Sequence, residues 1–163
     1  MSSMLGRRKI MKSCGFFSLL FAVFLIGCSN AADRNEAKKS IENFTTSITE
    51  ANRATGIINR GDPYSLVDPE GSDEMIRHFS SALTYAEAVD TFFLNQTYSE
   101  WGDRFENHFI KGIRLILDGH TTLDVETSLR GQRLLEEWDE WFSENLEGIR
   151  NSGQRDKSEQ AIP

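Results

Sequence analysis

The chain has 163 residues, and its 25 Asp and Glu outnumber its 18 Lys and Arg, which gives a net charge of −7 at pH 7. This length is sufficient for one domain with a sizeable core. The acidic balance argues against a nucleic-acid-binding protein, because contacts with phosphates need clustered cations. It also argues against attachment to anionic lipid headgroups through a basic surface.

The N-terminal segment has the pattern of an export signal. Arg7, Arg8, Lys9 and Lys12 form a basic cluster, and an uncharged apolar run covers residues 15–26. A run of this length fits the hydrophobic region of a signal peptide, whereas a helix that spans a bilayer needs about 20 residues. A transmembrane anchor is the alternative interpretation of this segment.

The apolar run ends in Leu25, Ile26, Gly27 and Cys28. This ending resembles the lipobox of bacterial lipoproteins, although Ile26 stands where Ala is commoner, and the resemblance covers residues 1–28 only. It implies that signal peptidase II recognises the three residues before the cysteine. It also implies that Cys28 carries diacylglycerol on its sulfur and, after cleavage, a fatty acid such as palmitate on its amine. Two or three acyl chains anchor a protein stably, because each buried CH₂ contributes about 0.8 kcal/mol.

The residue after the lipobox cysteine bears on localisation. In a Gram-negative host, Asp at this position tends to retain a lipoprotein in the inner membrane, so Ser29 implies the periplasmic face of the outer membrane. Removal of the signal leaves 14 Lys and Arg against 25 Asp and Glu, a net charge of −11. Cys14 is removed as well, so the mature chain would have Cys28 alone and could form no internal disulfide.

Beyond the signal, every long periodic segment has helical spacing, and no alternation typical of strands persists. Apolar or small residues recur at steps of three and four, which is typical of helices packed along one stripe. The predicted core residues on these stripes include Phe44 in the first helix and Met75 and Phe79 in the second. The predicted helices cover residues 33–59, 69–95, 98–118 and 123–151. Long helices joined by short turns predict an all-α fold, an antiparallel bundle of four helices.

The domain organisation follows from these helices. We expect a signal peptide at 1–27, a short tether at 28–33, the helical bundle at 34–151 and a polar, disordered tail at 152–163. The tether is short enough to hold the first helix close to the bilayer.

Local signals suggest how the later helices begin and end. Thr97 and Glu100 have the spacing of a capping box for the third helix. Gly119 is placed for a left-handed C-cap at the end of that helix. Thr121 or Thr122 is the expected start of the fourth helix.

Three further glycines lie inside the predicted helices, where each costs about 1 kcal/mol relative to Ala. They are explained either by close approach of two helices or by kinks, and they are Gly102, Gly112 and Gly131.

The mature sequence lacks the common motifs of catalysis and cofactor binding. It has no Cys-x-x-Cys-His for covalent haem, no Glu-x-x-His of di-iron bundles, no Gly-x-Ser-x-Gly elbow and no glycine-rich phosphate loop. Glu74 and His78 lie one helical turn apart, but two ligands do not make a metal site. We therefore expect no cofactor, no metal and no enzymatic activity.

The most unusual part of the mature chain is residues 134–142, where aromatic side chains alternate with acidic ones. Trp138 falls on the core stripe and Trp141 on its edge, so packing in the core is the simpler interpretation. The alternative is a partly exposed aromatic interaction patch with an acidic rim, to which Trp101 and Tyr98 would contribute. Trp and Tyr are favoured at the centres of protein interfaces.

These features favour a lipoprotein with a non-catalytic, protein-binding or structural role in the cell envelope, and a partner that is another envelope protein. The alternative is a carrier of an apolar ligand between envelope layers. Its basis is the apolar face of the second helix, which Ile76, Leu83 and Phe92 broaden, and the interior glycines, which could leave a cavity of several hundred Å³.

The anchor can be tested directly. Globomycin blocks signal peptidase II, so treated cells should accumulate the diacylated precursor. Mass spectrometry of the mature N-terminal peptide should find lipid on Cys28. Normal processing in the presence of globomycin, or a lipid-free Cys28, would contradict the resemblance.

Overall fold

The computed structural model describes residues 31–60 and 69–159, and all regular structure within them is helical. The all-α class is therefore confirmed. The predicted signal peptide and lipobox, including Cys28, lie outside the described residues. No helix in the described ranges is both long and apolar enough to cross a membrane.

In chain order the elements are α1 (Ala31–Arg60), α2 (Pro69–Glu87), α3 (Thr91–Thr97), α4 (Trp101–Arg104), the π-helical segment η2 (Phe105–Ile110), α5 (Lys111–Thr121) and α6 (Val125–Glu159).

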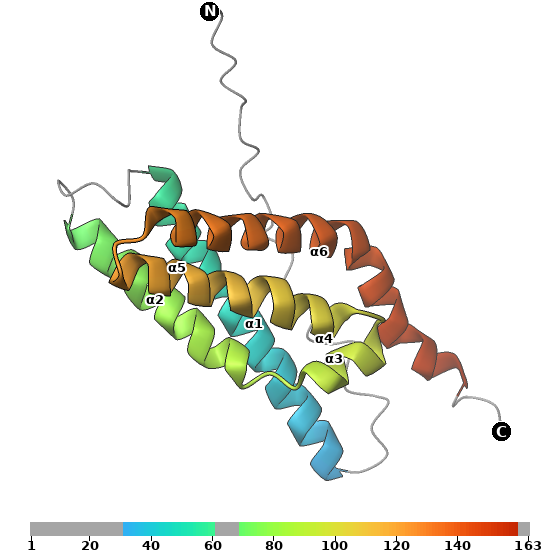
Figure 1. The fold of residues 1–163 in the computed structure, drawn as a ribbon. Coiled ribbons are helices and arrows are strands. Elements are labelled where there is room, and N and C mark those ends of the chain that lie inside the picture. The colour runs from blue at the N-terminus through green and yellow to red at the C-terminus, as the bar shows by residue number, and fades with distance from the viewer. Residues whose placement is uncertain (1–30, 61–68, 160–163) are drawn as a thin grey trace, which may run out of the picture.

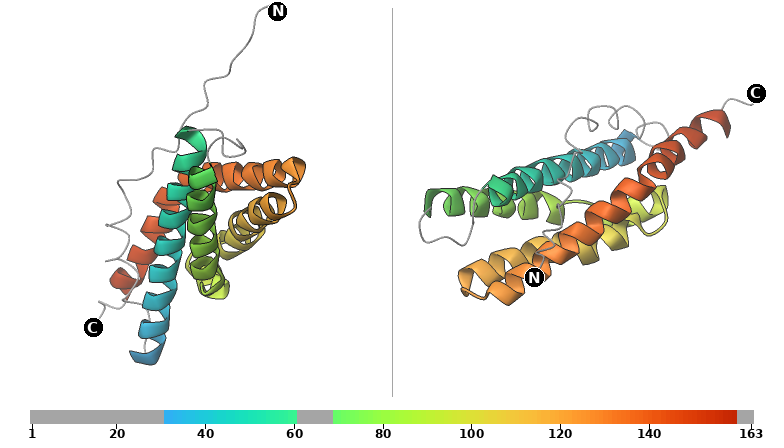
Figure 2. Two further views of the ribbon diagram at one scale, coloured as in Figure 1. Left: turned by 90° about the vertical axis from the view of Figure 1, so that its left-hand side faces the viewer. Right: turned by 90° about the horizontal axis from the view of Figure 1, so that it is seen from above.

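The helices form two antiparallel hairpins that cross obliquely (Figures 1 and 2). One hairpin pairs α1 with α2, and the other pairs the rod made by α4, η2 and α5 with α6. The short helix α3 connects the two hairpins. The predicted count of four helices is not what the described residues show, because the second predicted helix is divided and the third contains a π-helical segment.

Phe44 of α1 lies at the centre of the core. Its ring centroid is 5.2 Å from that of Trp101, 5.1 Å from Phe105 and 5.8 Å from Phe142. These three partners belong to α4, η2 and α6, so this side chain joins the two hairpins. Aromatic pairs of this kind contribute about 0.5–1.5 kcal/mol beyond the area that they bury.

The predicted helix at 69–95 breaks at residues 88–90, between α2 and α3. The Asp90 carboxylate caps α3 by accepting a hydrogen bond of 3.0 Å from the Phe93 amide. Two side chains of α1 satisfy the backbone of the turn. The Asp90 amide donates to Ser40 Oγ at 2.9 Å, and Asn43 Nδ2 donates to the Ala88 carbonyl at 3.0 Å. The break is stable because another helix satisfies the polar groups that it frees.

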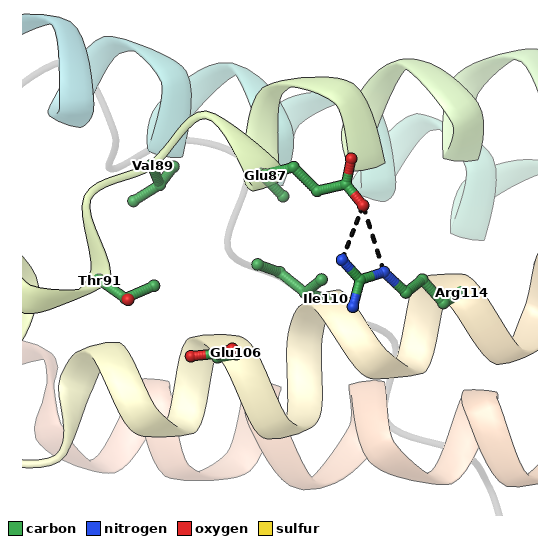
Figure 3. Close-up of a pocket in the computed structure, with 7 residues that line it drawn as sticks. Glu87, Val89, Thr91, Glu106, Ile110 and Arg114 are labelled. Atoms are coloured by element: carbon green, nitrogen blue, oxygen red, sulfur yellow. Dashed lines mark hydrogen bonds and ion pairs between the residues drawn. The ribbon is translucent and has the colours of Figure 1, made fainter.

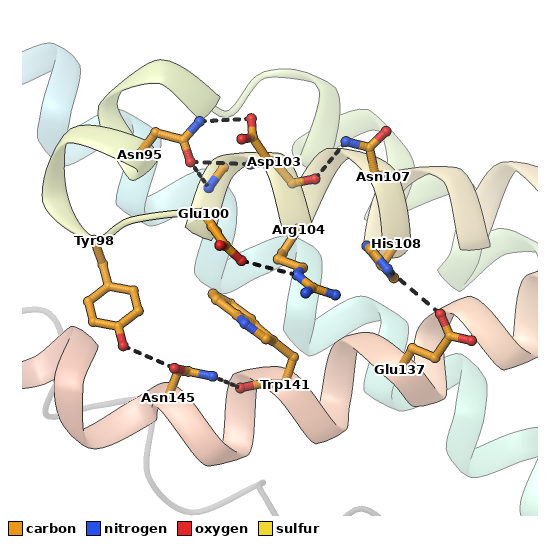
Figure 4. A network of polar contacts seen from close by, with 11 residues as sticks. Asn95, Tyr98, Glu100, Asp103, Arg104, Asn107, His108, Glu137, Trp141 and Asn145 are labelled. Atoms are coloured by element: carbon orange, nitrogen blue, oxygen red, sulfur yellow. Dashed lines mark hydrogen bonds and ion pairs between the residues drawn. The ribbon is translucent and has the colours of Figure 1, made fainter.

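The capping box predicted at Thr97 and Glu100 is wrong. Thr97 belongs to α3, and its hydroxyl donates to the Phe93 carbonyl at 2.9 Å. Glu100 precedes α4 with a left-handed φ of 65° and no side-chain cap. The cap comes from α3 instead, where Asn95 Oδ1 accepts from the amides of Gly102 at 2.7 Å and Asp103 at 3.2 Å (Figure 4).

The turn between α5 and α6 also differs from the prediction. Gly119 is buried inside α5, and the left-handed residue is Leu123, with φ 57°. Asp124, rather than Thr121 or Thr122, caps α6. It accepts hydrogen bonds from the Thr127 hydroxyl at 2.7 Å and from the amides of Thr127 and Glu126, and these bonds lower the pKa of its carboxyl. At its other end α6 continues to Glu159, so residues 152–159 are helical where a disordered tail was expected.

The interior glycines allow close helix contacts. A Cβ on Gly131 of α6 would lie 2.5 Å from the carbonyl oxygen of Gly112 in α5. A Cβ on Gly119 would lie 2.4 Å from Ser128 Oγ, and one on Gly102 would lie 2.0 Å from the Thr91 carbonyl oxygen. Of the two explanations, close approach is the one that these distances support.

Two Gly→Ala substitutions should therefore shift stability in opposite directions. Gly131→Ala should destabilise the fold by about 1–3 kcal/mol, because its new Cβ overlaps backbone that cannot move independently. Gly56→Ala in α1 has nothing within 4 Å of the new Cβ and should stabilise the fold by about 0.5–1 kcal/mol. Urea unfolding followed by circular dichroism measures both. Equal effects of the two substitutions would contradict the close contact between α5 and α6.

Candidate functional site

The predicted aromatic patch lies mostly in the core. Trp101 and Trp138 are only 1% and 4% exposed, so neither offers a surface to a partner. Packing in the core, the simpler interpretation, is therefore confirmed for Trp138, and the alternative of an exposed patch is wrong for both residues. They pack around Phe44 because the crossing of the two hairpins encloses them.

Tyr98 and Trp141 form the half-buried edge of this aromatic core (Figure 4). Their ring centroids are 6.4 Å apart, and the Arg104 guanidinium lies over the Trp141 ring at 5.9 Å. The Tyr98 hydroxyl donates to Asn145 Oδ1 at 2.9 Å. These contacts connect α3 and α4 with α6, which gives the edge a structural role. Nearby in α6, burial raises the pKa of the Asp139 carboxyl.

A groove of about 450 Å³ lies on another part of the surface, where the α2–α3 turn faces η2 and α5 (Figure 3). Buried apolar side chains form its floor, and polar side chains form its rim. The floor consists of Ala86, Val89 and Ile110, and the rim of Glu87, Thr91, Glu106 and Arg114. The groove depends on the break between α2 and α3, because both the last turn of α2 and the first residue of α3 line it.

An ion pair closes one end of the groove. Arg114 of α5 donates to Glu87 Oε1 of α2 through Nη2 at 2.8 Å and Nε at 3.2 Å. Both side chains are exposed, so the pair contributes at most about 1 kcal/mol to stability. Its role in the groove is positional, because it holds the Arg114 guanidinium on Glu87.

Glu106 lies on the η2 side of the groove, away from this ion pair (Figure 3). The Lys111 amide donates to the Glu106 carbonyl five residues back, which is the hydrogen bond of a π-helix. This wider turn keeps Phe105, Phe109 and Ile110 all buried and leaves Glu106 exposed. Within the described ranges no cation lies at ion-pair distance from the Glu106 carboxylate. Single-turn π-helical segments are frequent at functional sites.

Two exposed aromatic residues are sequence neighbours of residues that line the groove, although neither lines it itself. Phe92 is 69% exposed and follows the rim residue Thr91, and Tyr85 is 40% exposed and precedes the floor residue Ala86. In the part of the chain that the structure describes, these two are the exposed large aromatic residues. The periodic pattern placed Phe92 on the broad core face of one long helix, and the break at residues 88–90 turns it outward instead.

The three histidines join helices to one another. His78 Nδ1 of α2 lies 2.6 Å from Glu50 Oε2 of α1, with Glu74 at 3.8 Å from Nε2. His108 Nε2 lies 3.7 Å from Glu137 Oε2, and His120 Nε2 lies 3.5 Å from the Ser72 hydroxyl. Among the residues with described positions, no group of three or more His, Cys, Asp and Glu is arranged to hold a metal.

Comparison with other proteins gives no relative from which a function could be transferred. The sequence matches no family model, and neither a curated protein nor a solved structure is significantly similar to it.

Proposed function

We propose that this chain is a lipoprotein anchored through Cys28 at the periplasmic face of the outer membrane, and that its helical domain binds another envelope protein without catalysing a reaction. The lipobox resemblance of Leu25, Ile26, Gly27 and Cys28 supports the anchor. The outer-membrane location follows from Ser29 in a Gram-negative host.

The observation that carries the binding role is the exposed Phe92, which follows the groove residue Thr91 in the chain. A phenyl ring that is 69% exposed offers apolar surface whose burial by a partner would be favourable. Aromatic anchors surrounded by polar groups are typical of protein interfaces. The groove supplies this combination, with an apolar floor and a charged rim.

The position of the groove agrees with a partner protein that is met near the membrane surface. The helix α1 begins at Ala31, three residues after Cys28, and Ser40 lies nine residues further along α1. The chain between them bounds the Cys28–Ser40 distance at about 25 Å. Since Ser40 binds the Asp90 amide, the α2–α3 turn lies close to the anchored end of the molecule.

The groove is less suited to the alternative role as a carrier of an apolar ligand. Its volume is in the range of ligand sites, but its rim carries two carboxylates and a guanidinium. An apolar ligand would desolvate these charges and leave the Glu106 carboxylate without a partner, which is unfavourable. A cationic or amphipathic group of a protein fits this rim better.

Site-specific photo-crosslinking in the native host tests the binding role. A benzoylphenylalanine at position 92 should give one discrete cross-linked product with an envelope protein. The matched control is the same group at Leu123, which is 86% exposed but lies at the turn between α5 and α6. That position should give no product of the same mass.

A second variant separates binding from misfolding. Phe92→Ala removes a mostly exposed ring, so it should leave the free energy of unfolding nearly unchanged. It should weaken co-purification of the partner protein that the cross-link identifies. Identical cross-linking from positions 92 and 123, or no cross-link from position 92, would contradict the proposed function.

A further inference from the structure

We infer that the groove between the α2–α3 turn and η2 binds a cationic side chain, lysine or arginine, of the partner protein, and that Glu106 is the carboxylate that recognises it. This inference rests on the proposed protein-binding function and specifies the chemistry of the partner.

The floor of the groove suits the aliphatic part of such a side chain. Val89 and Ile110 are 8% and 5% exposed, and they present the accessible apolar atoms at the base of a space of about 450 Å³, with Ala86 fully buried behind them. Lysine and arginine bury their methylene stems along apolar surface while they keep the charged end at a polar rim. A short polar side chain or a compact anion would leave this floor uncovered.

The charges of the rim select a cation over an anion. Arg114 is the one cation that lines the groove, and Glu87 already binds it through two nitrogens. Glu106 has no cationic partner within the described ranges, so its carboxylate is available to an incoming group. An anion at Arg114 would lie beside the carboxylate of Glu87 and be repelled by it.

The net charge of the whole domain also favours a cationic ligand over an anionic one. The mature chain would carry 14 Lys and Arg against 25 Asp and Glu, a net charge of −11. Such a field attracts cationic segments and increases the rate at which they meet the groove. The groove then fixes the register, because Glu106 lies on one side of the apolar floor and the Glu87–Arg114 pair on the other (Figure 3).

The test is an NMR titration of the mature, lipidated, ¹⁵N-labelled protein in detergent micelles. The probes are four short Gly-Ser peptides that differ at one central residue, which is lysine, arginine, norleucine or glutamate. The lysine and arginine peptides should shift the amide signals of Thr91, Glu106 and Arg114. The norleucine peptide, which keeps the stem without the charge, and the glutamate peptide should not.

Two charge-neutralising variants complete the test. Glu106→Gln should weaken binding of the lysine peptide about two- to fivefold, as expected for one exposed ion pair. Glu126→Gln removes another exposed acid, at the start of α6, and should leave that affinity unchanged. Unperturbed amide signals away from residue 106 would show that the first variant is folded.

Three outcomes would overturn the inference. They are no shift at Thr91 and Glu106 up to the highest soluble concentration of the lysine peptide, equal binding of the norleucine peptide, and an unchanged affinity in Glu106→Gln. If one of these occurs while the cross-link from position 92 persists, the protein-binding role stands and only the recognition of a cation fails. If the lysine peptide binds but no cross-link forms, the recognition of a cation stands and the protein-binding role fails.

Discussion

The break between α2 and α3 is the constraint on which the candidate site depends. Ser40 and Asn43 of α1 bind the backbone of the turn, and Asp90 caps the helix that follows. These three contacts let the chain leave the direction of α2 without burying unsatisfied polar groups. A helix that continued through this turn would place Phe92 elsewhere and would leave no turn to face η2.

The second hairpin supplies the other wall of the groove. Gly112 and Gly131 bring α5 and α6 into backbone contact, and the π-helical segment η2 keeps Phe105 and Ile110 buried against the core. Glu106 is left at the surface opposite the turn (Figure 3). The groove is therefore built from two local departures from regular α-helix, one in each hairpin, which the aromatic contacts of Phe44 hold in place.

The helical stripes could be predicted from the sequence, but the breaks within them could not. The stripes identify the all-α class and core residues such as Phe44, Met75 and Phe79, because periodicity reports which face is buried. The stripe continues through residues 88–90, and the partners that stabilise the break come from Ser40 and Asn43, far away in sequence. The exposure of Phe92 and the availability of Glu106 also depend on contacts between residues that are distant in sequence. They follow from how the two hairpins meet, and a local sequence pattern does not report this.

We propose that the break at residues 88–90 presents a partner-binding surface near the end of the molecule that Cys28 would anchor. Because lipid would occupy the sulfur of Cys28, a cysteine introduced in place of Phe92 or Leu123 would be the one free thiol of the mature chain. In every view the α5–α6 turn lies far from the start of α1 (Figures 1 and 2). Spin labels on these cysteines, in liposomes that carry nickel-chelating lipid, should relax faster at position 92 than at position 123. Faster relaxation at position 123 would contradict the placement of the α2–α3 turn near the membrane.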